Sequence, residues 1–208
     1  MARNLDASCR LCRREGMKLF LKGIRCIGDK CGFTRRGYAP GQHGKLSRKL
    51  SNYGLQLREK QKVKRMYGIL ERQFRRYFTM ASKTKGVTGK VLIQLLERRI
   101  DNVLLRAGFA ASHAQARQIV RHGHVYVNNR RINIPSYLVE NTGLIEIRAK
   151  EKPIKNIRET IELTKDWPKP SWLDIDNQNL KLKVLRFPEK EDLQLPVQEQ
   201  LIVELYSK

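Results

Sequence analysis

The sequence lacks any apolar run that approaches the roughly 20 residues of a membrane-spanning helix. Its first residues also lack the apolar stretch of a secretory signal. The basic segments show no broad aromatic and aliphatic face of the kind that holds a helix in a membrane surface. From these absences we predict a cytoplasmic protein that does not bind membranes.

Catalytic motifs are missing as well. The sequence contains no Gly-rich phosphate loop of the Walker type, no nucleophile elbow and no His-Glu-x-x-His pattern. Carboxylates are sparse where the positive charge is densest. We therefore predict that the protein is not an enzyme.

Acidic residues are scarce in the N-terminal part of the chain. Residues 1–90 contain 24 Lys and Arg against 5 Asp and Glu, whereas residues 151–208 contain 10 against 11. The whole chain carries a formal net charge of +23. A positive excess that is so unevenly placed predicts a directed surface for a polyanionic partner, and we interpret this partner as nucleic acid.

Cysteine is absent after residue 31. The four cysteines follow the spacing Cys9-x2-Cys12-x13-Cys26-x4-Cys31. Four thiolates satisfy the tetrahedral preference of Zn²⁺, and the short spacing within each pair lets both of its cysteines bind the same ion. Neighbouring cations should favour the thiolate form. We predict a structural zinc site. The alternatives are two disulfides, which a reducing cytosol disfavours, an iron–sulfur cluster, and redox-active thiols.

The hydrophobic pattern predicts an α+β fold, with helices first and a small, mostly antiparallel sheet afterwards. Residues 1–45 are predicted to form a loop-rich arm. The predicted helices are 51–67, one around 70–78, one from Thr88 to a stop at Gly108, 112–122, 153–165 and 197–206. The predicted strands are 125–127, 144–147, 172–175 and 180–187.

Residues 98–134 form the second functional signal. The pattern predicts two helices joined by a loop, followed by a strand and a tight turn at Asn128-Asn129. Ser112 and Gln115 have the spacing of a capping box, so the second helix begins with a polarised terminus that can receive a phosphate. The simpler alternative is a packed helical hairpin with solvated arginines.

The residues of this segment carry a family resemblance. The pattern is Arg99-x-Asp101-x4-Arg106-x-Gly108-x3-Ser112-x2-Gln115-Ala116-Arg117-x2-Val120-x-His122-Gly123-x-Val125-x-Val127-Asn128. It resembles the small RNA-binding module named after the fourth protein of the small ribosomal subunit. The same module occurs in pseudouridine synthases, some tyrosyl-tRNA synthetases and a heat-shock ribosome-rescue protein. The resemblance thus implies RNA binding without specifying the host protein.

Further segments resemble the bacterial-type small (30S) subunit ribosomal protein family itself, in the same order. They are 38–44, 57–62, 67–69, 73–75, 85–89 and 199–206. The four cysteines match the zinc-bearing form of this family. There are departures, because His113 stands where the module usually has Arg or Lys, Asn129 replaces the usual turn glycine, and residues 4–8 do not match.

The resemblance implies a structural constituent of the small ribosomal subunit. It implies a primary binder of 16S ribosomal RNA that nucleates assembly of the subunit body and influences translational accuracy. The implied partners are 16S ribosomal RNA, neighbouring small-subunit proteins, messenger RNA where it enters the subunit and, in some members, the protein's own messenger RNA. It also implies nested domains: a zinc-binding arm (1–45), a helical domain (46–95, completed by 187–208) and an inserted RNA-binding module with an extended sheet (96–186).

Candidate site residues follow from the charge pattern and the resemblance. The zinc ligands are predicted to be Cys9, Cys12, Cys26 and Cys31. The predicted RNA contacts are Arg10, Arg13, Arg14, Arg35, Arg36, Gln42, His43, Lys45, Arg48, Arg58, Lys62, Arg65, Arg106, Ser112, His113, Gln115, Arg117, Arg121 and His122. For His43, His122 and His124 we favour RNA or packing contacts over metal binding. Trp167 and Trp172 are predicted as core residues in preference to base-stacking ones.

Two alternative functions would each require sequence features other than those observed. An RNA-modifying enzyme with this module needs a second, acid-bearing catalytic domain, for which the sequence has neither room nor motif. A zinc-finger DNA regulator needs a recognition helix joined to the cysteine pairs and prefers duplex DNA over folded RNA. RNA binding by a non-catalytic ribosomal protein is the function we predict.

Overall fold

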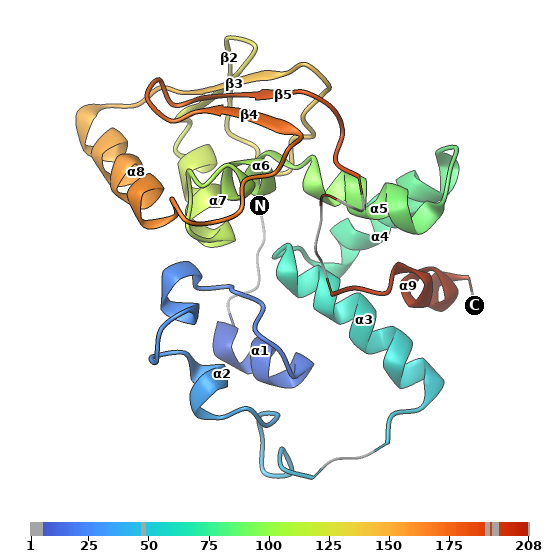
Figure 1. Cartoon of the computed structure of the whole chain (residues 1–208). Coiled ribbons are helices and arrows are strands. Elements are labelled where there is room, and N and C mark those ends of the chain that lie inside the picture. Colours follow the sequence, from blue (N-terminus) through green and yellow to red (C-terminus); the bar gives the residue numbers. More distant parts are fainter. Residues whose placement is uncertain (1–5, 47–48, 190–191, 193–195, 208) are drawn as a thin grey trace. The chain divides into compact units, whose positions relative to one another are not determined.

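The structure, a computed structural model, describes residues 6–46, 49–189, 192 and 196–207 (Figure 1). The chain divides into two compact units, unit 1 with residues 1–92 and 195–208 and unit 2 with residues 93–194. The boundary lies inside helix α5, Thr88–Glu97. In the ranges that the structure describes, no helix combines the length and the apolar character that a membrane crossing requires.

Unit 1 is helical. The predicted loop-rich arm contains helix α1 (Ser8–Glu15), the 3-10 helix η1 (Gly23–Cys26) and helix α2 (Gly32–Arg35), which the sequence pattern did not indicate. Helices α3 (Asn52–Met66) and α4 (Glu71–Lys83) follow, and α9 (Glu199–Tyr206) returns from the C-terminal end to pack along α3.

Side chains of α9 attach the C-terminal segment to the rest of unit 1. The Gln56 amide donates to Glu204 at 2.9 Å, and the Tyr206 hydroxyl donates to Glu71 at 2.9 Å. The Tyr206 ring stacks on Phe78 with 4.4 Å between centroids. Residues far apart in the sequence thus form one helical unit, because the apolar face of α4, with Phe74 and Tyr77, needs a partner to cover it.

Unit 2 packs helices on one antiparallel sheet. Its helices are α6 (Ile100–Arg106), α7 (His113–Arg121) and α8 (Glu151–Leu163). The strands β1 (Val125–Val127), β2 (Arg130–Ile132), β3 (Leu144–Ile147), β4 (Leu173–Asp176) and β5 (Lys181–Val184) form a sheet in the order β2-β1-β3-β5-β4. All neighbouring strands are antiparallel. The mixed fold with an antiparallel sheet is therefore confirmed.

The single helix predicted from Thr88 to Gly108 is wrong, since the chain breaks it into α5 and α6. Arg99 adopts an extended backbone (φ −67°, ψ 136°) and forms a bridge with Leu138. The amide of Val139 donates to the carbonyl of Arg98, and that of Ile100 donates to the carbonyl of Tyr137. Pairing with this distant segment takes the backbone groups that a continuous helix would use.

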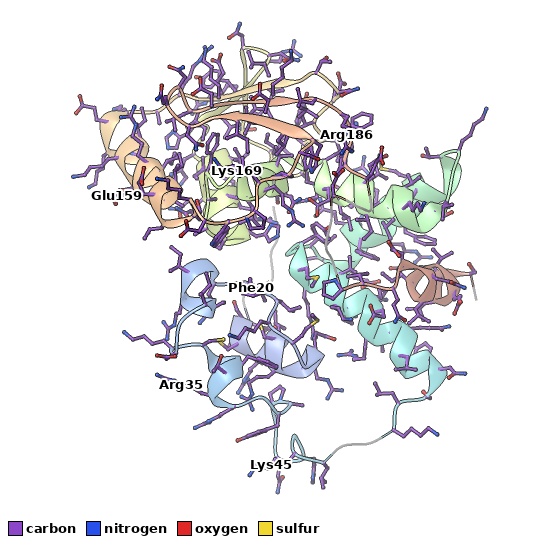
Figure 2. The ribbon with its side chains drawn as sticks, in the orientation of Figure 1. Phe20, Arg35, Lys45, Glu159, Lys169 and Arg186 are labelled. Carbon is purple, nitrogen blue, oxygen red and sulfur yellow. The ribbon has the colours of Figure 1, made fainter. Side chains whose placement is uncertain are left out.

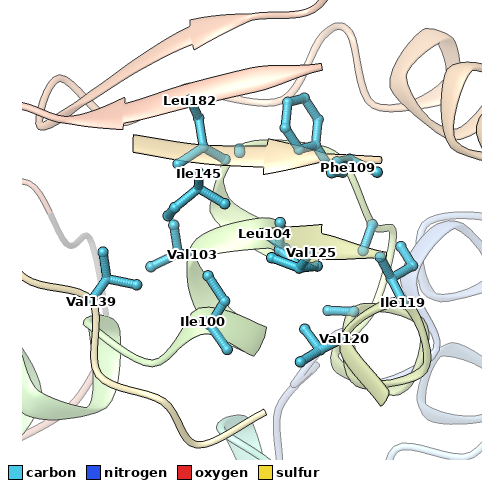
Figure 3. Packing of buried hydrophobic residues seen from close by; sticks show 14 of the residues in the cluster. Ile100, Val103, Leu104, Phe109, Ile119, Val120, Val125, Val139, Ile145 and Leu182 are labelled. Carbon is cyan, nitrogen blue, oxygen red and sulfur yellow. The ribbon is translucent and has the colours of Figure 1, made fainter. Parts of the chain in front are cut away.

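The core of unit 2 lies between α6, α7, α8 and the sheet (Figure 3). Alternate strand residues such as Val125, Ile145 and Leu182 point into it and are almost fully buried. Trp172 is also buried there, which confirms its predicted core role, whereas Trp167 is half-buried. The turn at Asn128-Asn129 has φ values of 47° and 62°, as a tight hairpin requires.

Candidate nucleic-acid interface

The four cysteines of unit 1 come together although they belong to different elements. Cys9 and Cys12 lie on α1, Cys26 ends η1, and Cys31 precedes α2. All four line one small cavity of about 10 Å³, which is the size of a single small occupant. A Cβ atom on Gly32 would stand 3.0 Å from the Cys9 Cβ, so a side chain there would crowd the Cys9 side chain.

The surroundings of the thiols differ. Burial raises the pKa of Cys12 and that of Cys26, which contradicts the expectation that nearby cations would favour the thiolate at these two positions. Backbone N–H groups of the following turn lower the pKa of Cys31 instead. Within the described residues, no group of three or more His, Cys, Asp or Glu side chains forms an assembled ligand set, so the zinc site stays a prediction.

The arm is attached to α3 through a buried carboxylate. Glu15, at the end of α1, has a side chain only 1% exposed and forms ion pairs with Arg58 (3.3 Å) and Arg65. Burial nevertheless raises the pKa of Glu15. On the same helix face Lys62 pairs with Glu59. Arg58, Lys62 and Arg65, which were predicted to contact RNA and form one stripe on α3, are therefore engaged within the protein. Arg58 and Arg65 share the distant Glu15, whereas Lys62 uses Glu59 one turn away on the same helix.

Other predicted contacts of the arm remain at its surface. Arg13 donates to the Tyr38 carbonyl at 2.9 Å, and Arg35 donates to the Asp29 carbonyl at 3.1 Å. The predicted RNA contacts with exposed side chains here are Arg10, Arg14, Arg35, Arg36, Gln42, His43 and Lys45 (Figure 2 labels Arg35 and Lys45). Arg48 lies outside the described residues.

Helix α4 carries a cationic face that the sequence analysis missed. Arg72, Arg75 and Arg76 are exposed, whereas Phe74 and Tyr77 of the same helix are buried. The signal was present, because three- and four-residue spacings place all three arginines on one side of the helix. Cations that the protein leaves exposed are available to neutralise phosphates.

In unit 2, much of the family motif builds a buried ionic network. Asp101 accepts hydrogen bonds from Arg99 at 3.0 and 2.7 Å and lies 3.8 Å from Arg117. Glu97 accepts two from Arg106, at 3.1 and 2.7 Å. The side chains of Arg99, Asp101 and Glu97 are at most 1% exposed.

Several predicted RNA contacts of this module therefore have internal partners. Arg117 is 6% exposed, and Arg106 is bound to Glu97. Burial lowers the pKa of His113 to about 4, so this imidazole is neutral at physiological pH. RNA contact by these three side chains stays a prediction. In the structure Arg117 lies against Asp101 of α6, Arg106 joins α6 to the end of α5, and His113 is buried.

The beginning of α7 follows the predicted cap in part. The Ser112 hydroxyl accepts a hydrogen bond from the Gln115 amide at 3.3 Å, as a capping residue should. The Gln115 side chain accepts from the Ala111 amide at 2.9 Å and donates to Thr160 at 2.9 Å, so it also ties α7 to α8.

The end of α7 presents exposed cationic and aromatic groups. Arg121 and His122 are exposed. Arg131 of β2 donates to the carbonyls of Gly123 (2.9 Å) and His122 (3.2 Å) and thereby caps the helix. Gly123 has φ 71°, and a Cβ atom there would collide with this guanidinium. Arg131 thus holds this helix end, and Arg121 stays exposed beside it.

Comparison with known proteins also divides the chain near residue 97, close to the boundary between unit 1 and unit 2. Residues 3–97 match the family described as "Ribosomal protein S4/S9 N-terminal domain", and residues 98–144 match the "S4 domain". The chain is 57% identical to "Small ribosomal subunit protein uS4" of Thermodesulfovibrio yellowstonii and to that of Acetivibrio thermocellus. It is 56% identical to the protein of this name from Dictyoglomus turgidum. Each of these similarities covers 100% of both chains.

Proposed function

Because this chain belongs to the family of small ribosomal subunit protein uS4, we propose that it is a primary binder of 16S ribosomal RNA that nucleates assembly of the subunit body. The family consists of structural proteins of the small ribosomal subunit and not of enzymes. The observation that carries the proposal is the separation of cations into two groups: those bound to internal carboxylates and those left exposed on α4, on the arm and at the end of α7.

In the mechanism that we propose, the protein binds RNA without changing its own conformation. Exposed arginines and lysines neutralise phosphates, which supplies affinity without sequence preference. Rigid helix ends, such as the Arg131-capped end of α7, fix the register on the folded RNA. The buried network of Asp101 and Glu97 keeps α6 and α7 in one arrangement, so that binding does not require the protein to reorganise.

Finer parts of the proposal rest on the family resemblance. They are contact with neighbouring small-subunit proteins, a position where messenger RNA enters the subunit, an influence on translational accuracy, and repression of the protein's own messenger RNA. Residues 151–208 carry almost balanced charge. This balance supports contacts of the C-terminal residues with proteins, since it gives them no electrostatic preference for RNA.

Removing the α4 cations tests the RNA-binding proposal. We expect the triple variant Arg72→Ala, Arg75→Ala and Arg76→Ala to bind a 16S ribosomal RNA fragment more weakly. The slope of log affinity against log salt should flatten by roughly 2 to 3, at just under one unit per neutralised phosphate. Filter binding or fluorescence titration at several salt concentrations measures both quantities.

Arg186→Ala is the matched control, because this arginine is exposed but held by Asp192 at 2.7 Å. It should leave the salt slope nearly unchanged. A scrambled RNA of the same length completes the design. Equal binding of the unaltered protein to cognate and scrambled RNA at physiological salt would show that it binds RNA only through non-specific electrostatic attraction. This result would overturn the proposed function.

We further propose that the arm holds one structural Zn²⁺ through Cys9, Cys12, Cys26 and Cys31. The support is the donor set, since four sulfur ligands suit tetrahedral zinc, together with the single small cavity that all four line. Zinc bound there would fix α1, η1 and α2 to one another and leave no position open for a substrate. Its contribution would be to folding and not to catalysis.

Metal analysis tests the zinc proposal directly. Protein purified without added zinc should contain one zinc per chain, and Cys26→Ser should lose most of it, because a hydroxyl is a poor zinc ligand. Cys26→His is the matched variant, since an imidazole can replace the thiolate, and it should retain the metal. Stoichiometric iron in the unaltered protein, or full zinc content in Cys26→Ser, would refute the assignment.

A further inference from the structure

Phe20 combines two features that are unusual for a phenylalanine. Its side chain is 54% exposed, although phenylalanine is a residue that normally gains from burial. Its backbone has φ 50°, a left-handed conformation that is an outlier for a bulky residue. Such a conformation is strained and persists where the surroundings impose it, often at functional sites.

The surroundings of Phe20 do impose this conformation. The Gly23 amide donates to the Phe20 carbonyl at 3.1 Å, which closes a turn. The preceding residue, Leu19, is buried, and its backbone N–H binds the Cys12 thiol. On the other side, the Lys22 amide donates to the Cys26 sulfur at 3.4 Å. The loop is thus held at both ends by the cysteine cluster, and Phe20 lies between these two attachments (Figure 2).

The exposed surface around Phe20 is apolar in part and otherwise cationic. Ile24 and Ile27 of the same loop are 39% and 57% exposed. Lys22 and Arg25 are exposed beside them, and Asp29 is the one acidic residue between residues 16 and 31. An aromatic ring surrounded by cations suits a partner that offers a flat π-face between negative charges. An unpaired nucleotide of RNA has this chemistry, whereas an acidic peptide would satisfy the cations and leave the ring unused.

We propose that Phe20 is a stacking platform for an unpaired nucleobase of ribosomal RNA, with Lys22 and Arg25 contacting the adjacent phosphates. The inference rests on the proposed RNA-binding function and adds one specific contact to it. The cysteine cluster then has a second role, because it fixes the loop that presents the ring.

Substitutions at Phe20 separate stacking from simple apolar contact. Phe20→Leu keeps an apolar side chain but removes the ring, and we expect it to weaken binding to the 16S ribosomal RNA fragment by roughly tenfold, within the range known for one base–aromatic stack. Phe20→Tyr keeps the ring and should bind within about twofold of the unaltered protein. Leu163→Ala removes an exposed apolar side chain at the end of α8 that is not among the predicted RNA contacts, and as the matched control it should have no effect.

Phe20→Gly tests whether the ring serves the fold. Glycine adopts positive φ without strain, so this variant should keep its thermal midpoint and its zinc content while losing as much RNA affinity as Phe20→Leu. Chemical probing of the RNA should also find one unpaired nucleotide that the unaltered protein protects and both variants leave reactive.

The outcomes distinguish this inference from the proposed function. If the unaltered protein binds cognate RNA specifically and Phe20→Leu binds equally well, the stacking proposal is wrong while the general function stands. If RNA affinity is unchanged but incorporation into small subunits fails, the loop contacts a protein and the proposal is again wrong. If the unaltered protein shows no specific RNA binding, the proposed function itself fails.

Discussion

Replacing Asp101 with alanine is expected to lower the free energy of unfolding by about 3–5 kcal/mol, the range for removing one partner of a buried ion pair. Asp101 is 1% exposed and accepts two hydrogen bonds from Arg99, whose side chain is 0% exposed. Arg117 lies on its other side at 3.8 Å. Without the carboxylate, two buried guanidinium groups lose their main negative partner in a region from which water is excluded.

Two controls isolate the cause. Asp174→Ala removes an exposed carboxylate from β4 and should change stability by less than about 0.5 kcal/mol. The double variant Arg99→Met with Asp101→Leu removes both charges and should recover part of the loss, because buried pairs can be replaced by apolar side chains. Urea unfolding followed by circular dichroism measures all three. A loss below about 1 kcal/mol for Asp101→Ala would contradict the structural role of the network.

The sequence identified the RNA-binding module but could not divide its residues between structure and contact. The motif of residues 99–128 contains Arg106 and Arg117 at fixed positions, and a surface role was predicted for both. Their partners, Glu97 and Asp101, become visible only when the break at Arg99 turns α6 back against α5 and α7. Helical spacing describes one helix at a time, so it does not show a partner from another element.

The same limit explains the stripe on α3. Three- and four-residue spacings place Arg58, Lys62 and Arg65 on one face of this helix. The engagement of Arg58 and Arg65 depends on Glu15, which is 43 and 50 residues away in the N-terminal arm. The partner of Lys62, Glu59, lies one turn away on the same helix, so this pair could have been predicted. In contrast, the exposed face of α4 could have been predicted, because the apolar residues of this helix have helical spacing and the positions between them carry Arg72, Arg75 and Arg76.

Local chemistry was the part that the sequence predicted well. The Asn128-Asn129 turn, the Ser112 cap and the alternation in β1 are set by neighbouring residues, and the structure contains all three. The cysteine spacing likewise predicted that four thiols would meet, and they line one cavity. The short helices of the arm were not indicated, because segments of four to eight residues carry too little periodicity.

His113 should make the stability of the protein depend on pH. Its ring lies in the module core near Asp101, Glu97, Arg99 and Arg106. Burial is the main cause that lowers its pKa to about 4, and the two arginines add to the effect while the two carboxylates oppose it. In the unfolded chain the imidazole has its ordinary pKa of about 6.5. Between these two values the unfolded state binds a proton that the folded state does not.

The sign of the effect follows from this difference. The contribution of His113 to stability is fully present above pH 6.5 and is lost as the pH falls toward 4, because protonation then favours the unfolded chain. Between pH 7 and pH 5 the loss should amount to about 2 kcal/mol. His113→Gln replaces the imidazole with a neutral amide that does not titrate in this range. Its stability should therefore decline less steeply over the same interval, whatever its stability at pH 7.

Comparing the two proteins removes the contributions of all other groups. Every other titratable group is present in both proteins, so only the difference between the two stability curves reports on His113. Urea unfolding at half-unit steps from pH 7.5 to pH 4.5 gives that difference. We expect the curves to separate below pH 6.5 and to differ by about 2 kcal/mol more at pH 5 than at pH 7. Parallel curves over the whole range would mean that His113 is protonated as readily in the folded protein as in the unfolded chain. The imidazole would then have to be accessible to water or held by the carboxylates of Asp101 and Glu97.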